Sequence, residues 1–537
     1  MTHPLIIRRV LGDRPFAEVG EPRTAAEDPR HGHIVVGGNI GAIRWPSLGT
    51  AAIDRWPQYR IGVYRADDLS CRHLHHSYWP VNSIDFHPSL PLAAVGTGRY
   101  DGSWDFDGEL LLVDLESGTV TTALEERREV LAVEWLDDRR LRLQVSPEDR
   151  DSDHAFTHAF ETVIEREDWS AAADRIIGYR QLIGPRVRRV HPPDAEHAHD
   201  LLRDRGAGAT VGWTLRRQVW AAETLDDGRV LAALQGARLE CWRPSGELQW
   251  AVPDLDGGRQ IHVCADQRSA WVHVRHTGRL TESGWRRAGN LVQRIALDDG
   301  RSLEEFDPGH AVTFTAGRGG WLAVREAWPA RDQGQTVLLT PDNTEAARFT
   351  LPNHDFFAAR RGSEPLFVQR PEGQAASGRQ WVVAIALEET DGSPSVRRLF
   401  PLEWDGDRTM HLFAGPGIQV GNDALIYAAT LHDHRGLLSQ NSFVVRRRLA
   451  GGAPQWVYGT DQPVTALDGD DETVFAAHRS GRIVAIDASN GSPRWERDLH
   501  VAGLPVVPLS LTVPRAGRLL IGTVDGRILD CETSTGP

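Results

Sequence analysis

The segment Ser480–Trp495 reads SGRIVAIDASNGSPRW, and its order of residue types decides the fold. A short, mostly apolar run follows a Ser-Gly turn, and a polar turn that ends at Gly491 comes next. Trp495 stands four residues after that glycine. Glycine readily adopts the left-handed conformation that a tight turn needs, and tryptophan offers a large flat apolar surface. The segment therefore predicts a strand, a turn, and an outer strand whose tryptophan lies against a neighbouring unit.

The same strand and turn recur along the chain, which is the signature of a repeat protein. The clearest copies are DGELLLVDLESG at Asp107–Gly118, GARLECWRPSG at Gly236–Gly246, GNLVQRIALDDG at Gly289–Gly300 and DGRILDCETSTG at Asp525–Gly536. Weaker copies begin at Gly334, Gly378 and Asn441, and two more are expected near Tyr59–Leu69 and His154–Arg166. One or two further apolar runs precede most copies. Strands and turns at a period of roughly 40 to 60 residues, without helical spacing, are typical of four-stranded β-propeller blades.

Three copies carry a glycine and a tryptophan four residues apart, and we assign these residues a structural role. The pairs are Gly246 with Trp250, Gly452 with Trp456, and Gly491 with Trp495. At this point the sequence resembles two known repeat families. AIDASNGSPRW resembles the repeat of PQQ-type (quinoprotein-like) β-propellers, and IDFHPSLPLAAVGTG followed by DGELLLVDLESG resembles a WD-repeat blade. The resemblance covers most of residues 31–537 in repeat form and implies an all-β propeller, but it specifies no function.

The resemblance to quinoproteins does not extend to their cofactor. The quinoprotein dehydrogenases are exported and carry a disulfide between adjacent cysteines, which has no match here. The four cysteines, Cys71, Cys241, Cys264 and Cys531, show no CxxC spacing. We therefore expect buried free thiols and no cofactor.

About ten blade units fit the chain. We expect N-terminal blades in residues 1–167, an irregular, partly helical insertion in residues 168–217, and seven further blades in residues 218–537. Within the insertion, PPDAEHAHDLLRDRG at Pro192–Gly206 predicts a short helix with Asp194 as a possible N-cap. The chain ends after a third-strand turn, and LIIRRV at Leu5–Val10 is expected to supply the missing outer strand and cover two strand edges. The repeats fit either one wide ring or two rings.

Charge and composition exclude several classes of protein. A net charge of -14 argues against a general nucleic-acid binder. The sequence contains no lysine, so all 60 basic residues are arginine, and lysine Schiff bases and P-loop lysines are excluded. Either a GC-rich coding sequence or selection against lysine modification would explain this gap. No apolar run approaches the roughly 18 residues of a membrane helix, and the N-terminus lacks a signal-peptide core, so we expect a cytoplasmic protein.

The segment GTGRYDGSWDFDGE at Gly96–Glu109 holds the candidate binding residues. Its acids resemble a calcium loop in composition, but Ser103 stands where that motif needs an acid. Its glycines lack the following helix of a nucleotide-binding fingerprint. The hairpin is about eight residues longer than its equivalent in Ser480–Gly491, and long loops on a rigid scaffold concentrate binding residues. The candidate partner-binding residues are Arg99, Tyr100, Asp101, Trp104 and Asp105.

Metal and catalytic sites have less support in the sequence. Histidines gather at His31 and His33, at His73–His76, at His191, His197 and His199, and at His432–His434. Nothing in the sequence brings together the three ligands of a catalytic zinc site, and no metal is expected. No G-x-S-x-G nucleophile elbow is present, and acid/base carboxylate pairs cannot be recognised without their separation in space.

We interpret the sequence as a non-catalytic β-propeller that acts as a protein-binding scaffold in a bacterial multiprotein system. Its expected partners are other protein subunits, with no role for a membrane. One alternative is a propeller-type hydrolase or lyase with a site at the central channel. A weaker alternative is an arginine-lined nucleic-acid surface drawn from RRVLGDR, RRQVW and VVRRRLAGG.

Overall fold

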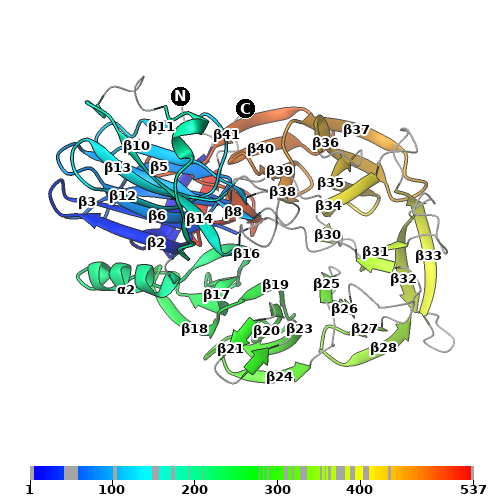
Figure 1. Cartoon of the computed structure of the whole chain (residues 1–537). Helices are drawn as coiled ribbons and strands as arrows, with labels where there is room; N and C mark the ends of the chain where they lie inside the picture. Colours follow the sequence, from blue (N-terminus) through cyan, green and yellow to red (C-terminus); the bar gives the residue numbers. More distant parts are fainter. Residues whose placement is uncertain are drawn as a thin grey trace. The chain divides into compact units, whose positions relative to one another are not determined.

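The computed structural model of the chain describes residues 5–41, 58–100, 106–147, 156–170, 176–192, 194–209, 211–276, 279–281, 284–286, 289–306, 312–316, 320–326, 335–350, 354–356, 359–360, 365–369, 381–387, 394–402, 411–432 and 437–533. These residues form mostly antiparallel β-sheets (Figure 1). They divide into two compact units, of which unit 1 holds the described residues up to Gly12 and from Arg216 onward, and unit 2 those between Asp13 and Leu215. Among the described residues, no helix has the length and apolar character needed to cross a membrane.

The described residues of unit 1 form seven sheets, numbered here in chain order. Sheet 1 contains β16 (Arg217–Thr224), β17 (Val230–Trp242) and β18 (Leu248–Asp254). Sheet 2 contains β19 (Gly258–Val263), β20 (Ser269–His276), β23 (Gly289–Ala296) and β24 (Ser302–Phe306). Sheet 3 contains β25 (Val312–Ala316), β26 (Leu322–Glu326), β27 (Gln335–Leu339) and β28 (Glu345–Thr350). Sheet 4 contains β29 (His354–Phe356), β31 (Leu366–Gln369), β32 (Trp381–Leu387) and β33 (Pro394–Pro401).

Sheets 5 to 7 complete this series. Sheet 5 contains β34 (His411–Val420), β35 (Ala424–His432), β36 (Leu437–Arg448) and β37 (Pro454–Thr460), with β30 (Ala359–Arg360) added in parallel at one edge. Sheet 6 contains β38 (Val464–Gly469), β39 (Thr473–His478), β40 (Arg482–Asp487) and β41 (Pro493–Asp498). Sheet 7 contains β44 (Pro508–Thr512), β45 (Arg518–Thr523), β46 (Ile528–Thr533) and β1 (Leu5–Leu11). Two hairpins are separate: β21 (Arg279–Thr281) with β22 (Gly284–Arg286), and β42 (His500–Val501) with β43 (Leu504–Pro505).

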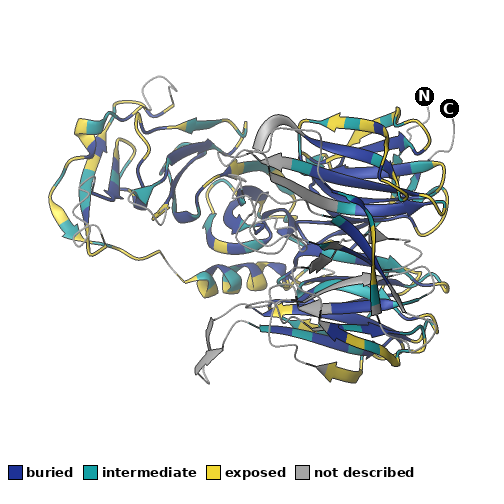
Figure 2. Cartoon of the chain, turned by 90° about the vertical axis from the view of Figure 1, so that its right-hand side faces the viewer, coloured by how far each residue is buried: buried dark blue, intermediate teal, exposed yellow. Residues whose placement is uncertain are grey.

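The apolar core of unit 1 lies between the sheets (Figure 2, dark blue). Apolar clusters join each sheet to the next, from sheets 1 and 2 to sheets 6 and 7. A further cluster, which includes Leu11, Val219 and Ile528, joins sheet 7 to sheet 1. Successive residues of one strand point to opposite faces of the sheet, and both faces are buried. On β39, for example, Val474 packs toward sheet 5 and Phe475 toward sheet 7. This explains why the strands read as nearly continuous apolar runs.

β1 is an outer strand contributed by the opposite end of the chain. It pairs antiparallel with β46, from Leu5 opposite Thr533 to Leu11 opposite Ile528. Leu5, Ile7 and Val10 also pack on the cluster between sheets 6 and 7. This is the pairing that the sequence predicts for Leu5–Val10.

The described residues of unit 2 form three four-stranded sheets, A to C. Sheet A has β2 (Glu21–Asp28), β3 (His33–Asn39), β4 (Tyr59–Arg65) and β5 (Cys71–Ser77). Sheet B has β6 (Val81–Phe86), β7 (Leu92–Thr97), β10 (Leu110–Asp114) and β11 (Val120–Thr122). Sheet C has β12 (Val130–Trp135), β13 (Arg140–Val145), β14 (His158–Glu165) and β15 (Arg186–Arg188). Apolar clusters lie between A and B and between B and C, and the second includes Leu182 of η3 (Tyr179–Leu182).

The two outer sheets of unit 2, A and C, differ in what covers them. The outer face of sheet A is covered by α2 (Ala195–Gly206) and η1 (Ala17–Val19), with Leu202 of α2 fully buried in their shared cluster. On β13 of sheet C, Leu141 and Leu143 are buried in the cluster with sheet B, whereas Arg142 alternates with them and pairs with Glu134. The helix expected at Pro192–Gly206 is confirmed, and Asp194 accepts a hydrogen bond from the backbone N–H of Glu196 (3.4 Å).

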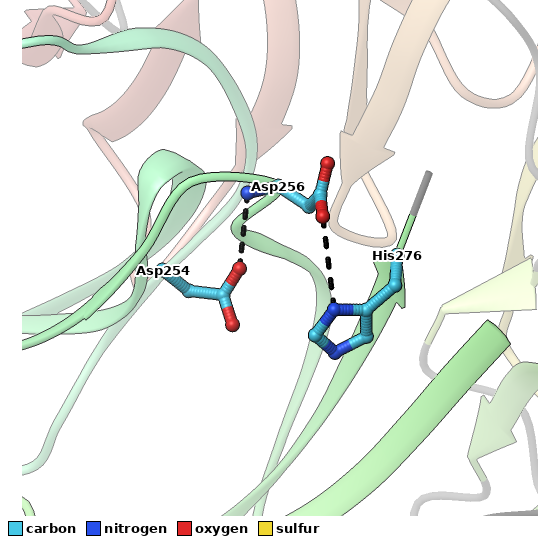
Figure 3. A group of neighbouring side chains, drawn as sticks. All are labelled: Asp254, Asp256 and His276. Carbon is cyan, nitrogen blue, oxygen red and sulfur yellow. Dashed lines mark hydrogen bonds and ion pairs between the residues drawn. The ribbon is translucent and has the colours of Figure 1, made fainter. Parts of the chain in front are cut away.

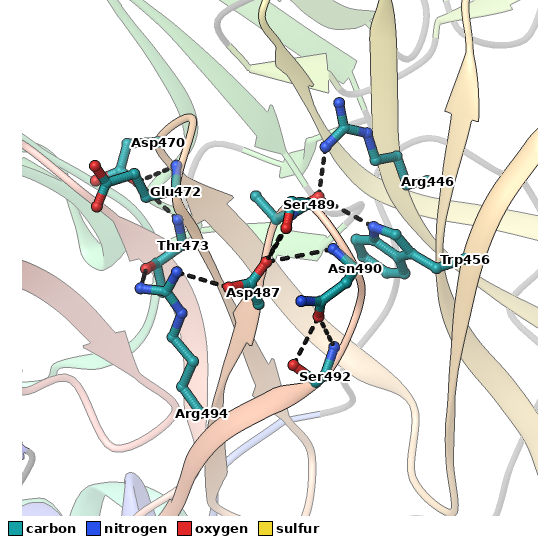
Figure 4. Close-up of polar contacts among 11 residues, drawn as sticks. Arg446, Trp456, Asp470, Glu472, Thr473, Asp487, Ser489, Asn490, Ser492 and Arg494 are labelled. Carbon is teal, nitrogen blue, oxygen red and sulfur yellow. Dashed lines mark hydrogen bonds and ion pairs between the residues drawn. The ribbon is translucent and has the colours of Figure 1, made fainter. Parts of the chain in front are cut away.

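In sheet 6, Asp487 stabilises the turn that follows the third strand, β40, by accepting hydrogen bonds (Figure 4). In Asp487–Gly491, Oδ1 of Asp487 accepts hydrogen bonds from the N–H groups of Ser489 (2.9 Å) and Asn490 (3.3 Å), and Oδ2 accepts one from Arg494 (2.8 Å). Hydrogen bonds from the Ser489 hydroxyl and from Arg494 lower the pKa of Asp487 to about 2. Gly491 then takes φ +78°. The turn chemistry of DASNG thus sets the local fold that the sequence predicted.

Candidate functional site

The candidate partner-binding residues fall on a hairpin of unit 2, of which the structure describes the base. β8 (Arg99–Tyr100) pairs antiparallel with β9 (Phe106–Asp107), and Tyr100 lies opposite Phe106. Arg99 donates a hydrogen bond from Nη1 to the hydroxyl of Tyr59 in sheet A (3.1 Å). The other three candidates, Asp101, Trp104 and Asp105, lie outside the described residues.

Tyr100 and Phe106 of this base form an aromatic triad with Phe156. The ring centroids of each pair are 5.1 Å apart. Tyr100 is 37% exposed and Phe156 is 49% exposed. Single exposed apolar residues are ordinary, whereas two exposed rings in contact with each other and with the half-buried Phe106 form a patch. The sequence pattern does not single out Phe106 or Phe156, because only folding brings the turn before β14 to this hairpin.

A buried ion pair supports the triad. The guanidinium carbon of Arg189 lies 4.7 Å from the ring centroid of Phe106. The same guanidinium donates to Oε2 of Glu129 (2.7 Å) and to the hydroxyl of Ser146 (2.9 Å). Glu129 is 3% exposed, and a buried carboxylate of this kind is stable only with such partners. The Arg189 side chain, held by Glu129 and Ser146, therefore fixes the position of the Phe106 ring in the triad.

The glycines and tryptophans assigned a structural role lie where one sheet meets the next. A Cβ atom at Gly491 of sheet 6 would lie 2.6 Å from the ring of Trp456 in sheet 5, and Nε1 of Trp456 donates to the carbonyl of Ala488 (3.0 Å). The other contacts between sheets are Gly452 against Phe400, Gly246 against Leu11, and Trp250 against Gly300, whereas Trp495 lies against Phe475 of its own sheet 6. The turn of one sheet thus commonly packs on the outer strand of the preceding sheet.

The histidine groups have local structural partners. His31 Nδ1 lies 2.6 Å from Oδ2 of Asp28, His73 bonds the carbonyl of Glu116, and His199 bonds the carbonyl of Pro22. Burial lowers the pKa of His76 to about 4. The side chain of His432 and the residues 433–434 lie outside what the structure describes.

The arginine-rich runs are also engaged within the fold. In RRVLGDR, Arg8 pairs with Glu532 and Arg9 with Asp530. In RRQVW, Arg216 pairs with Glu240 in the interior. In VVRRRLAGG, Arg447 is 7% exposed and donates to the carbonyls of Gly452 (2.6 Å) and Pro401 (3.0 Å). These contacts weaken the case for a nucleic-acid surface built from these runs.

Among the described residues, one group of His, Cys, Asp and Glu gathers closely enough to hold a metal ion: Asp254, Asp256 and His276 in unit 1 (Figure 3). Their candidate ligand atoms all lie within 4.8 Å of one another, and Nδ1 of His276 is 3.6 Å from Oδ2 of Asp256. The sequence pattern does not reveal this group, because PDLDGGRQ looks like any acidic turn.

The hydrogen bonds of Asp254 show that it stabilises the turn Asp254–Gly258. Its Oδ1 accepts the N–H groups of Asp256 (3.0 Å) and Gly257 (3.1 Å), and its Oδ2 accepts Nη2 of Arg238 (3.0 Å). These contacts hold the pKa of Asp254 below its ordinary value in spite of the opposing effect of burial, which is the largest single influence. A metal ion would have to displace this network, so the group is better explained as a structural turn.

This turn fixes the start of β19. Gly257 takes φ +69°, and a Cβ atom there would clash with the carbonyl of Leu234. A Cβ atom at Gly258 would clash with the carbonyl of Arg238. Only glycine permits both the conformation and the close approach. The register with β20 then shifts between Gly258 and Gln260, which leaves Arg259 at a β-bulge.

Arg259 lies in a cluster of positive charge. Its guanidinium carbon is 4.5 Å from the ring centroid of Trp220, at an irregularity of β16. Burial lowers the pKa of Arg259 to about 10, with the charges of Arg275 and Arg217 acting in the same direction and Asp256 opposing them. Burial likewise lowers the pKa of the neighbouring His273 to about 4, so that imidazole is neutral at physiological pH. The excess positive charge suits an anion better than a metal cation.

A scan against known protein families and a search of curated proteins found no match to this chain.

Proposed function

We propose that the seven sheets of unit 1 are the blades of a closed β-propeller. The supporting observation is the contact between the first and last sheets. The hydroxyls of Ser510 and Thr512 in sheet 7 donate to the carbonyls of Val219 (2.9 Å) and Ala222 (2.6 Å) in sheet 1. These bonds add to the shared apolar cluster of the two sheets. Closure buries the outer faces of what would otherwise be the two end sheets.

We further propose that the protein is a non-catalytic, protein-binding scaffold of a bacterial multiprotein system. The observation that carries this proposal is the aromatic triad of Tyr100, Phe106 and Phe156. Aromatic anchors on a rigid base are the usual centres of binding energy in protein interfaces. The triad loses little conformational entropy on binding, because Arg189 and the β8–β9 pairing already hold Phe106 in place.

The test is site-specific photo-crosslinking in the native host. A photoreactive phenylalanine analogue at position 100 should capture one defined partner, whereas the same analogue at position 78 should not. Tyr78 is the matched control, since it is an exposed aromatic residue of the same unit (48% exposed).

A double variant then measures the energetic role of the triad. Tyr100→Ala with Phe156→Ala should reduce partner affinity by at least about tenfold, in line with the loss of two aromatic anchors. Tyr78→Ala should leave the affinity unchanged. Equal partner recovery by the double variant and the wild type would refute the proposed surface.

The hydrolase or lyase alternative has weaker support. Within the described residues, its best candidate is the Asp256 and His276 pair, because Asp254 is engaged by Arg238. We therefore do not assign a catalytic role to this group.

A further inference from the structure

Two side chains in contact in unit 1 each carry a buried hydrogen-bond donor without a protein acceptor. Within the described part of the chain, Nε of Arg259 and Nε1 of Trp220 are both buried, and neither has a hydrogen-bond partner. The two side chains are in contact, with the guanidinium over the indole ring. Buried donors are almost always satisfied, and an exception calls for an explanation such as a bound ion or water. The two unpaired donors therefore mark a place that suits a hydrogen-bond acceptor.

The charges around this place specify the kind of acceptor. Arg217 and Arg275 are close enough to Arg259 to lower its pKa, and Asp256 is the one acid that opposes them in the described surroundings. Asp254 is already paired with Arg238. Arginines placed close together repel one another, and this repulsion destabilises the folded state. A bound anion would relieve the repulsion and accept the unused hydrogen bonds.

The backbone holds these groups in position before any ligand arrives. Arg217 and Trp220 belong to β16 and Arg259 to β19, the first strands of two neighbouring sheets that contact each other. The DLDGG turn fixes the start of β19, and Nε of Arg217 donates to Oε1 of Gln235 (2.6 Å). Bulges of this kind redirect side chains and are common beside binding sites. The arrangement has the preorganisation that a built site requires.

We propose that Arg259, Trp220, Arg217 and Arg275 form a binding site for an oxyanion of the carboxylate or phosphate type. The planar guanidinium offers Nε–H and Nη–H donors at the spacing of two oxyanion oxygens. The indole N–H of Trp220, in contact with this guanidinium, is a further donor without a protein partner. This site lies in unit 1 and is independent of the aromatic triad proposed for protein binding.

The test is a titration of the purified full chain with inorganic phosphate and, separately, with citrate, each against sodium chloride at equal ionic strength. Saturable binding by calorimetry is expected for at least one of the two probes. Tighter binding of phosphate would assign the site to phosphoryl groups, and tighter binding of citrate would assign it to carboxylates. Absence of saturable binding by both probes would overturn the proposal and leave water as the partner of the buried donors.

Three variants test the named side chains. Arg259→Gln should weaken binding by about tenfold or more, because it removes a charge-assisted donor pair. Trp220→Phe keeps an aromatic ring and removes the N–H group, and we expect a loss of severalfold. Arg275→Gln changes an exposed residue, so it should weaken binding without affecting the fold.

The control is Arg268→Gln, which removes the same charge from an exposed turn at the other end of β19. It should bind both probes as the wild type does. In the absence of an anion, Arg259→Gln should be at least as stable as the wild type, because it relieves repulsion. Unchanged binding by Arg259→Gln and Arg275→Gln, or weakening by Arg268→Gln to the same extent, would contradict the site.

Discussion

Replacing Gly491 by alanine tests whether contact between successive sheets, and not turn conformation alone, requires the repeated glycine. Two costs are expected. Alanine at φ +78° costs about 1 kcal/mol, because the left-handed conformation is strained for residues with a Cβ atom. The new Cβ atom would also lie 2.6 Å from the ring of Trp456. That ring is only 9% exposed and is held by its bond to Ala488, so overpacking adds about 1 to 3 kcal/mol.

Gly503 provides a matched control. It has φ +81°, and a Cβ atom at this position would meet no neighbouring atom within 4 Å, so Gly503→Ala carries the conformational cost alone. We expect Gly503→Ala to lower the free energy of unfolding by about 1 kcal/mol and Gly491→Ala to lower it by about 2 to 4 kcal/mol. Urea unfolding followed by circular dichroism gives both values. Hydrogen exchange of peptides from β39 to β41 assigns the loss to unit 1.

A double-mutant cycle with Trp456→Ala identifies the source of the excess cost. In that background the ring is absent, and Gly491→Ala should cost only about 1 kcal/mol. Equal losses for Gly491→Ala and Gly503→Ala would refute the packing argument. So would an excess cost that persists after Trp456 is removed.

Three other properties can be predicted from the structure. First, His273 has a pKa of about 4 in the fold, against 6.5 when unfolded, so the unfolded state binds more protons between these values. This histidine should lower the free energy of unfolding by about 2 kcal/mol from about pH 7.5 to about pH 5, in addition to the falls due to His76 and His262, whose pKa burial also lowers to about 4. In urea unfolding, His273→Gln should remove this one share of the pH dependence and leave the rest. Second, a chain that begins at Gly12 should associate through the bare edge of β46 in light scattering, and a peptide of residues 1–11 should reverse this. Third, Arg447→Lys should cost about 2 kcal/mol because it loses its bonds to Gly452 and Pro401, whereas Arg497→Lys at an exposed position should be neutral.

The strands and the helix could be predicted from the sequence because the residues that determine them stand close together in the chain. The turn Asp487–Gly491 carries its aspartate, its serine and its glycine within five residues, and these are the groups that make the turn's bonds. The helix at Ala195–Gly206 was found from Asp194 and the glycine that ends the run. The pairing of β1 with β46 was expected because the last repeat lacked its outer strand.

The group around Arg259 and the aromatic triad could not be predicted from the sequence, because each combines residues from different strands and turns. Arg259 stands in GGRQ, which contains nothing to distinguish it from other arginines that follow a turn. Its position depends on a bulge in β19 and on the ring of Trp220 in another sheet. Phe156 is likewise an ordinary apolar residue until the fold brings the turn before β14 to Tyr100 and Phe106. Sequence patterns specify repeats well, but they do not specify which side chains meet between them.

The use of arginine in the interior bears on the absence of lysine. Arg447 bonds two carbonyls and stacks on Phe400, and Arg216 bonds Glu240 and the carbonyl of Gly526 while it lies over Trp242. A lysine ammonium group cannot reproduce this planar geometry, so a structural need explains arginine at such positions. It does not explain arginine at exposed positions such as Arg497, where lysine would serve as well. Packing alone therefore cannot account for a chain without lysine, and a cause that acts on the whole sequence, either codon composition or avoidance of lysine modification, is required.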